Sequence, residues 1–191
     1  MNINFDKVRN HFGRLTQSQV DGINAIMQAV NDNNADDNKT KLSRADVAYM
    51  LATAWHETAR TMLPIREYGR GKGRKYGTNI DIDGSRYQGL PHIYYGRGYV
   101  QLTWLTNYKR MGQLLGVDLV NNPDLALDTK IAADIMIVGM VRGLFTGKSL
   151  SSYIKTGTRA EFTNARRIIN GTDKASLIAG YAVGFLGALE S

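Results

Sequence analysis

The sequence has no cysteine and only three prolines and three histidines among its 191 residues. Without cysteine the chain forms no disulfide and offers no thiol nucleophile, no cysteine-ligated zinc and no iron–sulfur cluster. Disulfides are also not required, because folding at this length buries roughly 70% of the surface that the unfolded chain exposes. His56 and Glu57 begin the zinc-protease helix pattern, but Arg60 stands where the second histidine is needed. We therefore expect neither a metal site nor a cofactor.

Long apolar runs are absent as well. The longest stretch without a formal charge is residues 175–189, and three glycines interrupt its 15 residues. A membrane-spanning helix needs roughly 18 or more apolar residues, so this stretch predicts a buried helix over 174–189. The alternative, a helix that disturbs membranes, is disfavoured because no cationic face accompanies it. The first ten residues lack the apolar core of a secretory signal, which leads us to expect a chain that starts in the cytoplasm.

Positive charge is in excess. Lysine and arginine number 24 against 17 aspartates and glutamates, which gives a net charge of +7 and a pI near 9.6. Such a field attracts polyanions, among them nucleic acid, anionic lipid and the bacterial cell wall, although many globular proteins carry similar charge for solubility alone. The basic glycine-rich segment 69–77 fits neither the dinucleotide fingerprint nor the P-loop spacing. As a nucleic-acid motif it is weak, and we expect no nucleic-acid partner.

Apolar residues recur at helical spacing over most of the chain. The pattern predicts a first helix over 15–30, capped by Thr16, and a second from Ser43 to near Thr61. The polar, turn-rich segment 31–41 between them reads as a surface loop. Three further helices are expected, over residues 131–145, 159–169 and 174–189.

The amino-acid composition changes between residues 69 and 98, which contain eight of the 20 glycines and several tyrosines. Glycine costs a helix about 1 kcal/mol relative to alanine, so a helix is not expected there. Either a short β-element with turns or a long functional loop fits this composition.

Two glutamates fit a division of labour between an acid and a base. Glu57 lies near the end of the second predicted helix, where apolar neighbours and the helix dipole favour its protonated form and Arg60 favours the ionised one. Glu67 follows among several cations that favour its ionised form. Hydrolysis of a glycosidic bond needs one carboxyl of each kind. By spacing alone, however, a solvated helix-end charge and a loop ion pair are favoured, because most carboxylates are simply exposed.

The surrounding sequence resembles glycoside hydrolase family 19, which comprises chitinases and phage or prophage endolysins. The likeness rests on His56-Glu57-Thr58, on Glu67, on the string YGRGYVQLTWLTNY over 95–108, and on RIING over 167–171. It covers residues 44–171 and is densest over 47–108. It implies a mainly α, lysozyme-like helical domain with a glycine-rich loop or small β-element at about 66–98. We accordingly expect one catalytic domain over 1–191, in which a helical segment and polar loop (1–41) precede a family 19-like core (42–191).

The resemblance also implies roles for individual residues. Glu57 would be the general acid, Glu67 the general base that activates a water on the opposite face of the sugar, and Thr103 a hydroxyl that holds this water. That arrangement inverts the anomeric centre. The residues implied in substrate binding are Gln101, Asn107, Tyr95, Arg97, Tyr108 and Asn170.

The sequence as a whole predicts an endolysin of the lysozyme or muramidase type, which hydrolyses the β-1,4 glycan backbone of bacterial peptidoglycan for host cell lysis. Small size, no secretion signal, no cysteine and a basic charge facing an anionic wall favour peptidoglycan over chitin. We expect a monomer that accumulates in the host cytoplasm, reaches the wall after membrane permeabilisation and contacts the anionic outer membrane. The alternatives are a chitinase acting on chitin oligomers and a non-catalytic basic protein that binds wall or membrane.

Overall fold

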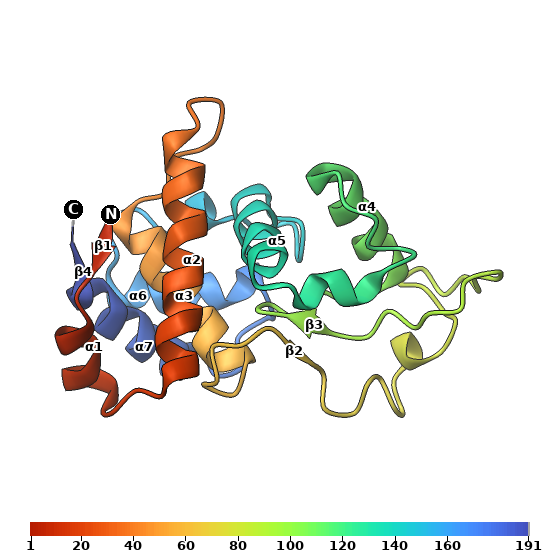
Figure 1. Ribbon diagram of the computed structural model, residues 1–191, viewed down its shortest axis with the longest axis horizontal. Coiled ribbons are helices and arrows are strands. Elements are labelled where there is room, and N and C mark those ends of the chain that lie inside the picture. Colours follow the sequence, from red (N-terminus) through yellow and green to blue (C-terminus); the bar gives the residue numbers. More distant parts are fainter. Residues whose placement is uncertain (191) are drawn as a thin grey trace.

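Helix α3 (Arg44–Glu57) runs through the centre of the helical body, beside α2 and α7 (Figure 1). The computed structural model describes residues 1–190. It confirms the predicted mainly α, lysozyme-like fold with little sheet. The other α-helices are α1 (Phe5–Phe12), α2 (Gln17–Ala35), α4 (Leu105–Leu115), α5 (Thr129–Arg142), α6 (Arg159–Ala165) and α7 (Ala175–Ala188). The 3₁₀ helices are η1 (Lys75–Gly77), η2 (Pro123–Leu127), η3 (Leu150–Ser152) and η4 (Arg166–Ile168).

Two short antiparallel strand pairs complete the fold. Strand β1 (Asn2–Ile3) pairs with β4 (Leu189–Glu190) and so joins the two ends of the described chain. Strand β2 (Ile65–Arg66) pairs with β3 (Arg97–Gly98), with Ile65 opposite Gly98 and Arg66 opposite Arg97. The second pair lies beyond the end of α3, which places it next to the predicted catalytic region.

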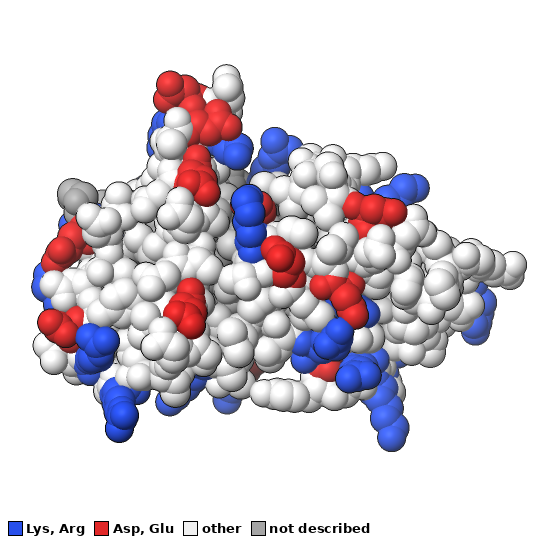
Figure 2. Space-filling model, in the orientation of Figure 1, with Lys and Arg blue, Asp and Glu red and all other residues white. Residues whose placement is uncertain are grey.

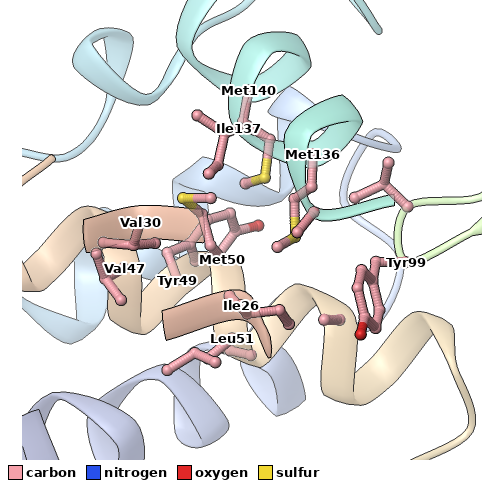
Figure 3. Close-up of a cluster of buried hydrophobic side chains, with 14 of the residues drawn as sticks. Ile26, Val30, Val47, Tyr49, Met50, Leu51, Tyr99, Met136, Ile137 and Met140 are labelled. Atoms are coloured by element: carbon pink, nitrogen blue, oxygen red, sulfur yellow. The ribbon is translucent and has the colours of Figure 1, made fainter. Parts of the chain in front are cut away.

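The core is built around α3, whose residues 47–55 are all buried. In Figure 3, Met50 of this helix lies among Met136 and Met140 of α5, while Ile26 and Val30 come from α2. A helix that is apolar all round belongs inside a protein, and each large side chain that it buries contributes roughly 1.5–3 kcal/mol. The last residue of this helix is therefore held on a rigid support.

The first two predicted helix caps are confirmed, but α2 is longer than predicted. Thr16 and Gln19 form a capping box, as Ser43 does with Asp46 at the start of α3. Helix α2 then continues five residues past the predicted end at residue 30, through a run that we expected to be loop. The reason is that Asn33 and Asn34 turn their side chains to the following segment, where they bond the backbone of residues 40 and 42. Polar composition therefore did not mark the helix end.

Helix α3 ends at Glu57, earlier than the predicted end near residue 61. The Thr58 hydroxyl donates to the carbonyl of Ala54 at 2.7 Å and accepts from the Met62 amide at 3.0 Å, which folds the chain back on the helix end. Three of the next residues, Ala59, Arg60 and Met62, take the left-handed conformation. This tight turn directs the chain from Glu57 towards β2.

The later helices follow the prediction with shifted ends. Helix α5, capped by Asp128, begins two residues before the predicted start. It ends at Arg142, three residues before the predicted end, where Gly143 takes the left-handed conformation. The predicted helix 159–169 divides into α6 and the 3₁₀ helix η4. Helix α7 packs against α3 as the predicted buried helix. No helix in residues 1–190 combines the length and apolar character needed to cross a membrane.

Residues 67–96 form a long, mostly exposed segment between β2 and β3, so both of the structures considered for the glycine-rich region are present. The buried carboxylate of Asp81 anchors its middle, accepting hydrogen bonds from the backbone and hydroxyl of Thr106 at the start of α4. This segment and α4 make up the right-hand end of the molecule in Figure 1.

Candidate active site

Glu57 is paired with an arginine that comes from far along the sequence. Nη1 of Arg166, the first residue of η4, donates to Oε1 of Glu57 at 2.7 Å. The arginine side chain is only 2% exposed, and its Nε donates to the Asp173 carbonyl at 2.9 Å. The glutamate side chain is 18% exposed, so this ion pair lies at the edge of the interior. Oε1 is thereby fixed, while Oε2 accepts no hydrogen bond from residues 1–190.

Neither Arg60 nor His56 supplies a positive charge to Glu57, although Arg60 was expected to. Arg60 does not reach Glu57: its Nη2 donates to the Tyr181 hydroxyl at 2.8 Å, and its guanidinium lies over the Tyr181 ring. The positive charge next to Glu57 comes from Arg166 instead. Burial lowers the pKa of His56 below its ordinary value of 6.5, and the charge of Glu57 opposes this only in part. His56 is therefore neutral at neutral pH and adds no second cation.

Glu67 is held by the irregular segment and by β3. Its backbone amide donates to the Gly96 carbonyl at 2.8 Å, which extends the β2–β3 pairing by one bond. The Tyr76 hydroxyl donates to Oε1 at 3.0 Å, and the Gly96 amide donates to Oε2 at 3.4 Å. Burial and the bond to Glu67 raise the pKa of Tyr76 above 10.0, so this hydroxyl stays a donor at neutral pH. The Tyr76 ring packs edge-on against Trp104.

Thr103, Gln101 and Asn107 form one chain of hydrogen bonds. The Thr103 hydroxyl donates to the Gln101 carbonyl at 2.8 Å, and the Asn107 amide donates to the Thr103 carbonyl at 2.8 Å. The Gln101 side-chain amide donates to the carbonyls of Ile65 and Gly98, one on each of β2 and β3. The structure thus gives the amide groups of Gln101 and Asn107 positioning contacts, and their predicted binding of substrate remains a prediction.

Tyr95, Arg97 and Tyr108 come together in a second cluster. Arg97 is 4% exposed, and its guanidinium lies 3.8 Å from the centre of the Tyr95 ring. Its Nη1 donates to the Tyr108 hydroxyl at 3.1 Å, and that hydroxyl donates to the Tyr95 carbonyl at 2.8 Å. These contacts fix the loop before β3 on α4.

Asn170, the last of the predicted binding residues, is exposed just after η4. Its backbone amide donates to the Arg166 carbonyl at 2.9 Å, which links it to the Glu57 side of the site. Sequence reasoning missed both Arg166 and Tyr76, the residues that contact the two glutamates. Arg166 stands directly before the RIING motif, and only this proximity could have suggested it. Among residues 1–190, no group of three or more histidine, aspartate or glutamate side chains could hold a metal ion.

The arrangement defines a class of protein, a lysozyme-like helical domain with one carboxyl at the end of its central helix and another beside a short strand pair. Solved structures share this fold. Chitinase C from Streptomyces griseus HUT6037 aligns over 97% of this chain and 77% of its own, with a TM-score of 0.63 and 21% identity. A bacterial family 19 chitinase covers 98% of this chain and 96% of its own, with a TM-score of 0.59 and 23% identity.

Residues 21–141 match the family model described as chitinase class I. The chain therefore belongs to glycoside hydrolase family 19. Its relatives include endochitinase 1 from Theobroma cacao, 62% identical over 93 residues, which cover 43% of this chain and 28% of that protein. An endochitinase from Carica papaya is 33% identical over 99 residues, or 48% of this chain and 41% of that protein. The chain thus matches less than half the length of either relative.

One relative shows that membership of this family does not by itself establish catalytic activity. The inactive chitinase-like protein 1 from Hevea brasiliensis is 55% identical over 38 residues, which cover 20% of this chain and 12% of that protein. Activity of this chain must therefore be argued from its own side chains.

Proposed function

We propose that the protein hydrolyses β-1,4 linkages between N-acetylated sugars with inversion, using Glu57 as acid and Glu67 as base. The observation that carries this proposal is the placement of Glu57. Arg166 fixes Oε1 from inside the protein, which leaves Oε2 without a bond from residues 1–190. A proton on Oε2 is the one that Glu57 would deliver to the departing glycosidic oxygen.

The base side of the site suits activation of a water. Because the Thr103 hydroxyl donates its proton to the Gln101 carbonyl, its lone pairs are available to accept from a water. Such a water would donate one hydrogen to Thr103 and the other to Glu67. In that orientation a lone pair of the water oxygen points at the anomeric carbon. The Tyr76 hydrogen bond keeps Glu67 in one orientation. An inverting mechanism requires about 6.5–9.5 Å between the two carboxyl groups to admit the water.

As the substrate we propose the glycan backbone of bacterial peptidoglycan, with the protein acting as a muramidase-type endolysin. The net charge of +7 supports this choice, since it draws the protein to an anionic wall. Action as a single monomeric domain, release from the host cytoplasm after membrane permeabilisation, and contact with an anionic outer membrane belong to the same proposal. Chitin is the second candidate, because the relatives from Theobroma cacao and Carica papaya are named endochitinases.

The test measures reducing ends released from purified peptidoglycan and from chitin oligomers. We expect Glu57→Gln and Glu67→Gln each to slow hydrolysis by about 100- to 10,000-fold, the range that general acid–base catalysis supplies. The matched control is Glu190→Gln, an exposed glutamate paired with Lys7 at the joined chain ends. It should act like the unaltered protein, and circular dichroism should show all three variants folded.

Each other outcome decides between the candidates. Hydrolysis of chitin oligomers without hydrolysis of peptidoglycan would reject the endolysin in favour of a chitinase. Lysis of bacterial cells is measured alongside. If the Glu57→Gln variant lyses cells as well as the unaltered protein does, the enzymatic function is rejected in favour of a basic binding protein. Mass spectrometry of the released muropeptides then identifies which of the two β-1,4 bonds is cut, because the new reducing end is either muramic acid or glucosamine.

A further inference from the structure

A cavity lies on the face of the β2–β3 pair opposite to Glu67. Side chains alternate between the two faces of a strand, so Arg66 points away from the side that Glu67 takes. Arg97 is directly opposite Arg66 in the register and shares its face. The cavity has a volume of about 580 Å³. The side chains that give it its chemistry are Arg66, Arg70, His92, Tyr95, Arg97 and Asp124.

The cavity has an excess of positive charge. Three arginines face one carboxylate, Asp124, which accepts from Arg66 at 2.7 Å and from Nε of Arg97 at 2.8 Å. The hydrogen bond from Arg66 lowers the pKa of Asp124, so this carboxylate is ionised at neutral pH. Arg70 forms no ion pair with any residue of 1–190. Figure 2 shows basic side chains beside an acidic one over this part of the molecule.

Arg97 is incompletely satisfied although its side chain is only 5% exposed. Its Nε bonds Asp124, and its Nη1 bonds two backbone carbonyls and the Tyr108 hydroxyl. Its Nη2 finds no acceptor in the described part of the chain. Because Arg97 lines the cavity, an oxyanion bound there would accept a charge-assisted hydrogen bond from Nη2. Nη2 and the unpaired guanidinium of Arg70 therefore supply two donors for one anion.

We propose that this cavity binds a carboxylate of the peptide that branches from a peptidoglycan strand. The proposal rests on the proposed substrate, and it adds a recognition site for the peptide behind the glycan site. A singly charged carboxylate suits the cavity better than a doubly charged phosphate, because Asp124 remains close by. An extended peptide spans about 3.5 Å per residue, so a few residues are enough to pass the edge of the strand pair.

The test is calorimetric binding of the free stem tetrapeptide of peptidoglycan to the full chain. We expect Arg70→Ala to weaken binding about tenfold, which is the loss of one charge-assisted hydrogen bond. The matched control is Lys72→Ala, which removes the same charge from the same loop but does not line the cavity. The tetrapeptide with its carboxylates amidated should bind neither the unaltered protein nor either variant.

Three results would overturn the proposal: no binding by the unaltered protein, equal weakening by Arg70→Ala and Lys72→Ala, or unchanged binding of the amidated peptide. Inorganic phosphate is the third probe. If phosphate binds in an Arg70-dependent way and the tetrapeptide does not, the cavity is a phosphate site and the peptide assignment is wrong. Because the probe is not hydrolysed, failure here is separate from failure of the proposed function, which appears as lack of peptidoglycan turnover.

Discussion

The ion pair between Arg166 and Glu57 predicts a measurable coupling in stability. Replacing Arg166 by methionine leaves a carboxylate that is 18% exposed without its cation. Removal of one partner from a buried pair typically costs about 3–5 kcal/mol, and the partial contact of Glu57 with solvent places this case near 3 kcal/mol. Glu57→Gln keeps an oxygen that accepts from Arg166 and should cost about 1–2 kcal/mol. The double variant leaves neither charge unpaired, so its cost falls short of the sum by about 2 kcal/mol.

Urea unfolding of the four proteins at neutral pH measures this coupling energy directly. The control is Lys130→Met, which breaks the exposed pair with Asp134 on α5, where the lysine side chain is 73% exposed. Exposed pairs of this kind are worth about 0.5 kcal/mol or less, so the control should barely change the free energy of unfolding. A coupling below about 0.5 kcal/mol between residues 57 and 166 would refute the argument that the buried arginine positions the proposed acid.

Three further predictions concern the proposed base, stability in acid and the β2–β3 strand pair. Tyr76→Phe removes the hydroxyl that orients Glu67, so kcat for hydrolysis should fall while circular dichroism shows the variant folded. Four backbone amides, that of Gly157 foremost, lower the pKa of Glu161 from 4.5 to about 2. The stability that Glu161 gives is therefore complete above its unfolded value and is lost as the pH falls from 4.5 towards 2; Glu161→Gln should flatten this loss in a plot of Tm against pH. Gly98→Ala puts a Cβ 2.8 Å from the Ala126 carbonyl at a φ of +89°, and should destabilise the protein by about 2 kcal/mol or more in urea unfolding.

Features that depend on neighbouring residues were predictable from the sequence. Thr16 and Ser43 cap helices because the capping side chain and its partner lie three residues apart, and the sequence contains both. The cluster of glycines likewise predicted the irregular segment, because it too is a pattern of neighbouring residues. The contact between Arg166 and Glu57 joins residues 109 positions apart, and no local pattern specifies such a partner. The predicted end of α2 was wrong for a related reason. The hydrogen bonds of Asn33 and Asn34 to the next loop exist only once the chain has folded back.

The two proposed catalytic carboxyls rest on supports of different stability. Glu57 ends a helix whose residues 47–55 are all buried, and an arginine from the interior fixes one of its oxygens. Glu67 begins a mostly exposed segment whose middle is anchored by Asp81, and its side chain is held by Tyr76 from the same segment. Regions with few buried contacts open at lower free energy than the core. The position of the proposed base therefore depends chiefly on Tyr76, whose hydroxyl donates to Glu67 and whose ring packs edge-on against Trp104.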